Sequence, residues 1–152
     1  MHVKDFLVTR HILTDLQATD KAGLLRELSR RAGAALNIPS EQISTALLKR
    51  EQLGSTGMGN GFAIPHACIA GVSEPFGMLV RLDDPVDFEA VDDQPVDLLF
   101  LLLTPEPSQS QQLNALASVA RRLRDSKALQ ALRTAKNARA IYQLMTEDAA
   151  KE

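Results

Sequence analysis

The stretch from Val96 to Leu103 constrains the fold of this chain more than any other. Seven of its eight residues are apolar, and the single exception is Asp97. A strand with one face in water alternates apolar and polar side chains, whereas a continuous apolar run is typical of a strand covered on both faces. The stretch therefore predicts a central β-strand enclosed between two layers of other elements, as in an α/β domain.

Segments with helical periodicity flank this predicted strand on both sides. Apolar residues recur at three- and four-residue spacing, which predicts long helices at about 20–37 and 41–52 and from Ser108 or Ser110 to about Arg124. Shorter helices are expected at about 129–133 and 137–145. The expected N-caps, whose side-chain oxygens can accept backbone N–H groups, are Thr19 or Asp20, Ser40, Ser108 or Ser110, and Asn137.

Further strands are expected at 62–64 and 77–82, with a turn at Asp83–Pro85 and a loop at Thr104–Ser110. Residues 1–16 remain ambiguous: Phe6-Leu7-Val8 could close a short helix, and His11-Ile12-Leu13 could begin a strand that ends near Leu16. A chain of 152 residues has the common size of one domain. The prediction is one α/β domain over residues 1–152, with helices on both faces of the sheet.

Composition and charge exclude several classes of protein. The net charge of −2 gives no general attraction to nucleic acid or to an anionic membrane. No apolar run approaches the length of a membrane span, and the first residues do not have the form of a signal peptide. The single cysteine, Cys68, rules out an internal disulfide. A cytoplasmic protein without membrane insertion and without nucleic acid as a partner is expected.

Charge is unevenly distributed in the second half of the chain. Between Arg81 and Arg121 there are eight carboxylates and no lysine or arginine, whereas residues 121–139 hold seven bases and only Asp125 as an acid. Two interpretations stay open. The two segments could be ordinary solvated surfaces, or an acidic face and a basic face that select different protein partners.

The segment from Arg50 to His66 carries the clearest chemical signal. It contains four of the eight glycines and ends with Ile64-Pro65-His66. The proline fixes its own φ and favours an extended backbone before it, so the histidine is presented in a restricted direction. Small polar residues and free N–H groups are typical of an anion-binding concavity, and the candidate phosphate-binding residues are Ser55, Thr56, Gly57, Gly59, Asn60 and Gly61.

This segment does not fit the common nucleotide-binding motifs. No Gly-Lys-Ser/Thr follows the glycines, and the segment leads to a predicted strand, whereas a P-loop or a dinucleotide fingerprint leads into a helix. Arg50 could complement the negative end of its helix or bind phosphate oxygens with its guanidinium group. Cys68 is interpreted as a small core residue, and His66 with Cys68 lacks the further ligands of a metal site. No metal or other cofactor is expected, and His2 and His11 are interpreted as non-functional.

The same segment resembles the signature of type-2 enzyme IIA domains of the phosphoenolpyruvate-dependent phosphotransferase system. The matching parts are Arg50-Glu51, the run from Gly54 to Gly61 and Ala63-Ile64-Pro65-His66, with a second match at 94–100. The resemblance covers almost the whole chain and is strongest to the nitrogen-regulatory branch of the family. It implies a mixed sheet of about five strands.

The resemblance also implies a function. His66 would accept a phosphoryl group on Nε2 from a histidine-containing phosphocarrier protein, with Arg50 holding the phosphate and no metal required. The protein would be a phosphocarrier that regulates nitrogen, potassium or carbon metabolism through partners such as sensor kinases or transporters. Two alternatives remain: a sugar-transport enzyme IIA that passes phosphate to a IIB partner, and a regulatory binding module with weakened phosphotransfer.

One position departs from the family pattern. Relatives open the third long helix with a histidine before a leucine, whereas this chain has Gln112-Leu113. An amide can donate a hydrogen bond to phosphate but cannot become cationic. Gln112 is therefore expected to replace the second histidine of the family, with a weaker contact to the phosphoryl group.

Overall fold

The strand predicted at the centre of the fold is β6 (Val96–Pro105), and it has partners along both edges. In the computed structural model, which describes residues 1–107 and 109–147, β5 (Phe76–Val86) pairs with β6 in antiparallel orientation. The other edge of β6 carries β3 (Phe62–Ala63) and β4 (His66–Ile69), both parallel to it. With β1 (Ile12–Leu13) beside β5 and β2 (Gly57–Gly59) beside β3, the described part of the chain forms a mixed sheet of six strands.

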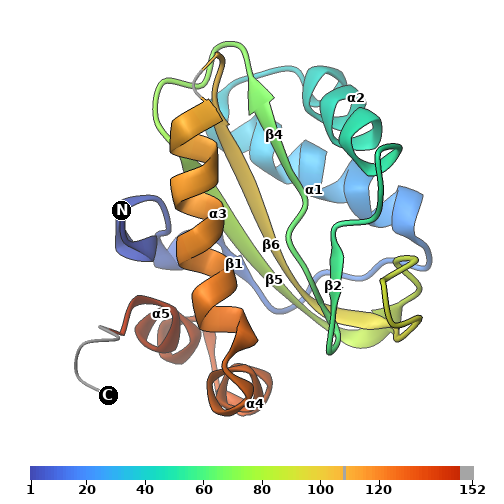
Figure 1. The fold of residues 1–152 in the computed structure, drawn as a ribbon, viewed down its shortest axis with the longest axis vertical. Helices are drawn as coiled ribbons and strands as arrows, with labels where there is room; N and C mark the ends of the chain where they lie inside the picture. The colour runs from blue at the N-terminus through green and yellow to red at the C-terminus, as the bar shows by residue number, and fades with distance from the viewer. Residues whose placement is uncertain (108, 148–152) are drawn as a thin grey trace.

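Successive side chains of β6 enter two different cores. Leu98, Phe100 and Leu102 belong to one core, while the alternate residues 99, 101 and 103 belong to the other. The first core is completed by α3 (Gln109–Arg124), α4 (Ser126–Thr134) and α5 (Ala138–Thr146), and the second by α1 (Lys21–Leu36) and α2 (Ser40–Glu51). Figure 1 shows these helices on the two faces of the sheet, which confirms the predicted α/β architecture.

Side-chain caps fix the start of three helices. Asp20 accepts a hydrogen bond from the Gly23 N–H at 2.7 Å at the start of α1, and Asn137 accepts from Ala140 N–H at 2.9 Å at the start of α5, both as predicted. Asp125, which directly follows the predicted end of the preceding helix near Arg124, caps α4. The prediction for Ser40 was wrong, since this residue is the first of α2 and Pro39 precedes it.

The cap of α3 was predicted at Ser108 or Ser110. Ser110 lies inside the helix, which begins at Gln109, and Ser108 lies outside the described residues. At the N-terminus, residues 3–5 and 9–11 form short 3-10 helices before β1.

Two strands are longer than predicted. The turn expected at Asp83–Pro85 is part of β5, because pairing with β6 resumes at Val86↔Val96 after a register shift. The loop expected from Thr104 begins later, since β4 pairs with β6 as far as Ile69↔Pro105. Tertiary pairing therefore overrides local turn signals at both places.

β3 and β4 follow the same edge of β6 and are separated only by Ile64 and Pro65. Phe62 pairs with Leu98 and His66 with Leu102, while the Pro65 carbonyl accepts a hydrogen bond from Leu102 N–H at 2.9 Å. Proline has no N–H for a strand ladder, so it divides the edge into two short strands. His66 is thus the first residue of β4, a strand that the sequence analysis did not predict.

Candidate functional site

His66 lies where an edge strand separates the two helical layers. α2 and α3 lie on either side of β4 in Figure 1. The side chain of His66 is half-buried and lines a cavity of about 730 Å³. Arg50, from the last turn of α2, lies on one side of this cavity, and apolar residues of α3 form the other side. The predicted histidine and arginine, 16 positions apart in sequence, are therefore brought together.

Both ring nitrogens of His66 have defined partners. Nδ1 lies 2.8 Å from the carbonyl oxygen of Ile64, and a carbonyl can only accept, so Nδ1 carries the hydrogen. Nε2 then keeps its lone pair, and the Arg50 Nε–H donates to it at 3.2 Å. The hydrogen bond from Nδ1 therefore selects the tautomer in which Nε2 is the nucleophilic nitrogen.

Burial keeps this imidazole neutral. Desolvation lowers the pKa of His66 from its usual 6.5, and the positive charge of Arg50 adds to that effect. The hydrogen bond to Ile64 and the negative charge of Glu51 oppose the shift without reversing it. The neutral ring is thus favoured at pH 7.

Arg50 is held in place by a second hydrogen bond. Its Nη1 donates to the Gly54 carbonyl at 2.8 Å, so the guanidinium group bridges the end of α2 and the imidazole. Gly54 has φ +142°, a backbone conformation that residues other than glycine rarely adopt. The glycine therefore allows the turn whose carbonyl anchors Arg50.

Glu51, to which the sequence analysis gave no role, fastens the segment that follows Arg50. Its carboxylate accepts hydrogen bonds from Thr56 N–H at 3.0 Å and from Thr56 Oγ1–H at 2.5 Å. Lys21, the first residue of α1, forms an ion pair with the same carboxylate at 3.0 Å, and the Glu51 side chain is only 6% exposed. The only signal in the sequence was the position of Glu51 directly after Arg50 in the family motif.

Most of the predicted phosphate donors of the glycine-rich segment already have acceptors inside the protein. Thr56 donates both its N–H and its O–H to Glu51, and Ser55 donates its hydroxyl to the Phe88 carbonyl at 2.8 Å. The Gly57 N–H donates to Ser55 Oγ at 3.0 Å. Ser55 and Thr56 line the His66 cavity, but their donors stabilise the loop, so we do not include them among the phosphate ligands.

The rest of that segment extends away from His66. Gly57 and Gly59 form strand β2, and a Cβ on Gly57 would lie 2.7 Å from the Cβ of Ala90, which explains this glycine by close packing. The Asn60 N–H donates to Asp92 at 3.0 Å. Neither Asn60 nor Gly61 lines the His66 cavity; both line a separate one that also contains Asp92, Asp97 and Arg133. The structure therefore does not bring Gly59, Asn60 and Gly61 to the histidine.

The α3 side of the cavity adds two arginines that the sequence analysis did not assign to the site. Arg121 and Arg124 line it together with Arg50, and none of the described residues that line it is a carboxylate. Gln112 is half-buried in the first turn of α3 and is not a lining residue, whereas the adjacent Leu113 is. A run of bases at 121–124 is visible in the sequence, but only the packing of α3 places two of them along the cavity that His66 lines.

Neither a metal cluster nor a membrane span is found in the part of the chain that the structure describes. No group of three His, Cys, Asp or Glu side chains is suitably arranged for a metal ion there. Cys68 points to Thr104, with 3.5 Å between Sγ and Oγ1. Among the described helices, none combines the length and the apolar character needed to cross a membrane.

Comparison with known proteins places this geometry in a family. Residues 5–148 match the family model "Phosphoenolpyruvate-dependent sugar phosphotransferase system, EIIA 2". The chain is 41% identical over 145 residues to a nitrogen regulatory protein of Bradyrhizobium diazoefficiens, with 95% of each chain covered. It is 40% identical over 128 residues to the nitrogen regulatory protein of Escherichia coli, covering 84% of this chain and 78% of that one.

A solved structure supports the assignment. The nitrogen regulatory protein IIA-Ntr of Neisseria meningitidis superimposes with a TM-score of 0.89 and 32% identity, covering 95% of this chain and 99% of the other. Sequence, fold and family model agree over nearly the same residues. The chain therefore belongs to the EIIA 2 family of the phosphoenolpyruvate-dependent sugar phosphotransferase system, with nitrogen regulatory proteins among its relatives.

Proposed function

We propose that the protein is a phosphocarrier whose His66 accepts a phosphoryl group on Nε2 from a histidine-phosphorylated carrier protein. The observation that carries the proposal is the pair of contacts on the ring: Nδ1–H donates to the Ile64 carbonyl, and Nε2 faces Arg50 in an open cavity. Family membership supports the same role.

The transfer step is a displacement between two nitrogens. The Nε2 lone pair of neutral His66 forms a bond to phosphorus, while the N–P bond of the donor breaks and leaves its electron pair on the donor imidazole. The phosphorylated donor ring carries a proton on its other nitrogen, so it departs neutral. His66 becomes a phosphoimidazolium whose Nδ1–H still donates to Ile64. No proton has to move between the proteins, so positioning and charge stabilisation drive the reaction.

Arg50 stabilises the transferred group in this proposal. Its Nε–H leaves Nε2 when the phosphoryl group arrives and donates to a phosphate oxygen, while Nη1 keeps its bond to the Gly54 carbonyl. A guanidinium hydrogen bond to phosphate is charge-assisted and about twice as strong as a neutral one. Arg50 therefore changes its acceptor without leaving its anchor.

The test is labelling with phosphoenolpyruvate and the upstream phosphotransfer proteins. The expected product is an acid-labile, base-stable adduct that mass spectrometry maps to His66. His66→Ala should abolish labelling, while His2→Ala, which changes an exposed histidine elsewhere, should label normally. Equal labelling of the His66→Ala protein would refute the proposal.

We further propose that the phosphorylation state controls contacts with regulatory partners such as sensor kinases or transporters. Similarity to nitrogen regulatory proteins over 95% of the chain favours this output over the transfer of phosphate to a sugar-transport IIB protein. Phosphorylation brings a phosphoryl group with about two negative charges, offset in part by the positive imidazolium ring, into a cavity lined by arginines, which changes the partners it can attract. Partner affinities of the unmodified protein, the phosphorylated protein and His66→Glu should differ; identical values would exclude the switch.

A further inference from the structure

Two arginines on the rim of the His66 cavity are not used by the fold. Arg121 and Arg124 are exposed on the second half of α3 and line the cavity. Within residues 1–107 and 109–147, no hydrogen bond or ion pair engages either guanidinium group. Asp125 lines a second cavity together with Arg121, and Asp97 lines a third together with Arg124. Neither carboxylate forms an ion pair with these two arginines.

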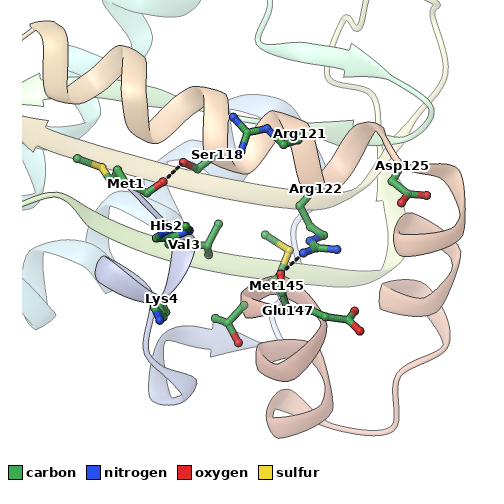
Figure 2. A pocket seen from close by; sticks show the side chains of 11 residues that line it. Met1, His2, Val3, Lys4, Ser118, Arg121, Arg122, Asp125, Met145 and Glu147 are labelled. Atoms are coloured by element: carbon green, nitrogen blue, oxygen red, sulfur yellow. Dashed lines mark hydrogen bonds between the residues drawn. The ribbon is translucent and has the colours of Figure 1, made fainter. Parts of the chain in front are cut away.

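Neighbouring arginines behave differently. Arg122 donates to the Glu147 carbonyl at the end of α5, and Figure 2 shows its side chain directed there while Arg121 leaves α3 in another direction. Arg133 is bound to Asp97, with Nη2 at 3.0 Å from Oδ1. These contacts hold helices to the sheet and to one another. Arg121 and Arg124 have no such structural task, so they are available to a ligand.

The shape of the cavity indicates that this ligand is a protein. Its α3 side runs from Leu113 to Arg124, about 16 Å of helix at 1.5 Å per residue, which is much longer than a phosphoryl group. Leu113 is 66% exposed and Met58 is 40% exposed, although both are apolar. Exposed apolar side chains in one patch with charged residues are typical of protein–protein interfaces.

Building on the function proposed above, we propose that Arg121 and Arg124 form a docking rim for the donor carrier protein. The proposal requires carboxylates on the carrier surface around its phosphohistidine, facing the two arginines. The charge of the rim supports this choice, since the cavity has three arginines and no acid of its own among its lining residues. Charges at the edge of an interface act mainly on the rate of association and on its salt dependence.

The experiment compares two phosphoryl donors on the double variant Arg121→Gln/Arg124→Gln. The matched control is Arg26→Gln/Arg139→Gln, which removes the same charge from exposed positions on α1 and α5. With the phosphorylated carrier protein at low salt, we expect kcat/KM of the rim variant to fall about threefold or more, and its salt dependence to become shallower. With phosphoramidate, a small donor that needs no docking, both variants should label at the parent rate.

Two results would refute the proposed docking rim. One is an unchanged rate with the carrier protein. The other is an equal loss with both donors, which would mean that the arginines act on the phosphoryl group or on the fold. If neither donor labels His66 in the parent protein, the proposed function fails. Titration calorimetry with the unphosphorylated carrier then decides separately: weaker binding by the rim variant supports the docking rim, and equal binding or none refutes it.

Discussion

Replacing Glu51 by glutamine tests whether the buried carboxylate fastens the loop that anchors Arg50. The carboxylate accepts two hydrogen bonds from Thr56 and pairs with Lys21 at 3.0 Å. A charged acceptor contributes about 1.5–3 kcal/mol per bond, against about 0.5–1.5 for a neutral one. Weakening the two hydrogen bonds should therefore lower the free energy of unfolding by about 2 kcal/mol. With the weakened Lys21 contact, the expected decrease is about 2–3 kcal/mol.

Urea unfolding measures this loss, and the chain offers a matched control. Glu89 also lies near Lys21, at 3.5 Å, but its side chain is 76% exposed while that of Glu51 is 6% exposed. Glu89→Gln should therefore cost less than about 0.5 kcal/mol, because exposed ion pairs contribute little. Equal destabilisation by the two substitutions, or no loss for Glu51→Gln, would refute the reasoning. Labelling of the Glu51→Gln protein by phosphoramidate should also slow, because the turn that holds Arg50 is less firmly fixed.

Four further predictions concern the phosphoryl site itself. Arg50→Lys should slow labelling of His66 about tenfold or more, since an ammonium cannot reproduce the forked contacts to Nε2 and the Gly54 carbonyl; a rate equal to that of the parent would contradict this. Gln112→His places a group that can become cationic next to the lining residue Leu113 and should raise the labelling rate or lengthen the phosphohistidine half-life; if neither changes, a histidine at this position adds nothing to the site. The labelling rate should stay constant as pH falls through 6.5 and decline only below it, because the lowered pKa keeps His66 neutral; an inflection at or above 6.5 would be inconsistent. For the same reason, His66 adds stability that is complete above pH 6.5 and is lost as pH falls toward its folded pKa, which acid titration of unfolding can measure.

The sequence predicted the frame of the fold well because its main signals are local. The apolar run became β6, and the caps at Asp20 and Asn137 start their helices as expected. The short strand β4 was missed because it exists through pairing with distant residues, as in Cys68↔Thr104. The strand β2 was missed because it is only three residues long, two of them glycines, and pairs with the adjacent β3, as in Gly57↔Ala63. Asp97, the one polar residue in the apolar run, is explained only by Arg133, which lies 36 positions away.

The candidate site was predicted less completely for a geometrical reason. The glycine-rich segment and His66 are adjacent in sequence, yet they run along β6 rather than folding back on one another. Gly61 meets β6 at Asp97, while His66 pairs with Leu102. Five residues of strand at about 3.3 Å each separate these points by about 16 Å. A motif can therefore be contiguous in sequence while its two ends serve different parts of the structure.

The resting geometry also explains why a single arginine can serve both states of the site. Without phosphate, Nε2 in its partly buried cavity would be an acceptor with no hydrogen bond. The Arg50 Nε–H supplies that hydrogen bond at 3.2 Å. When phosphorus takes that lone pair, the same Nε–H faces the new phosphate oxygens, so the arginine loses one acceptor as it gains another. The anchor from Nη1 to Gly54 persists through the exchange and limits the movement. The guanidinium contact thus becomes stronger only when charge arrives on His66, which is the condition for stabilising the phosphorylated state selectively.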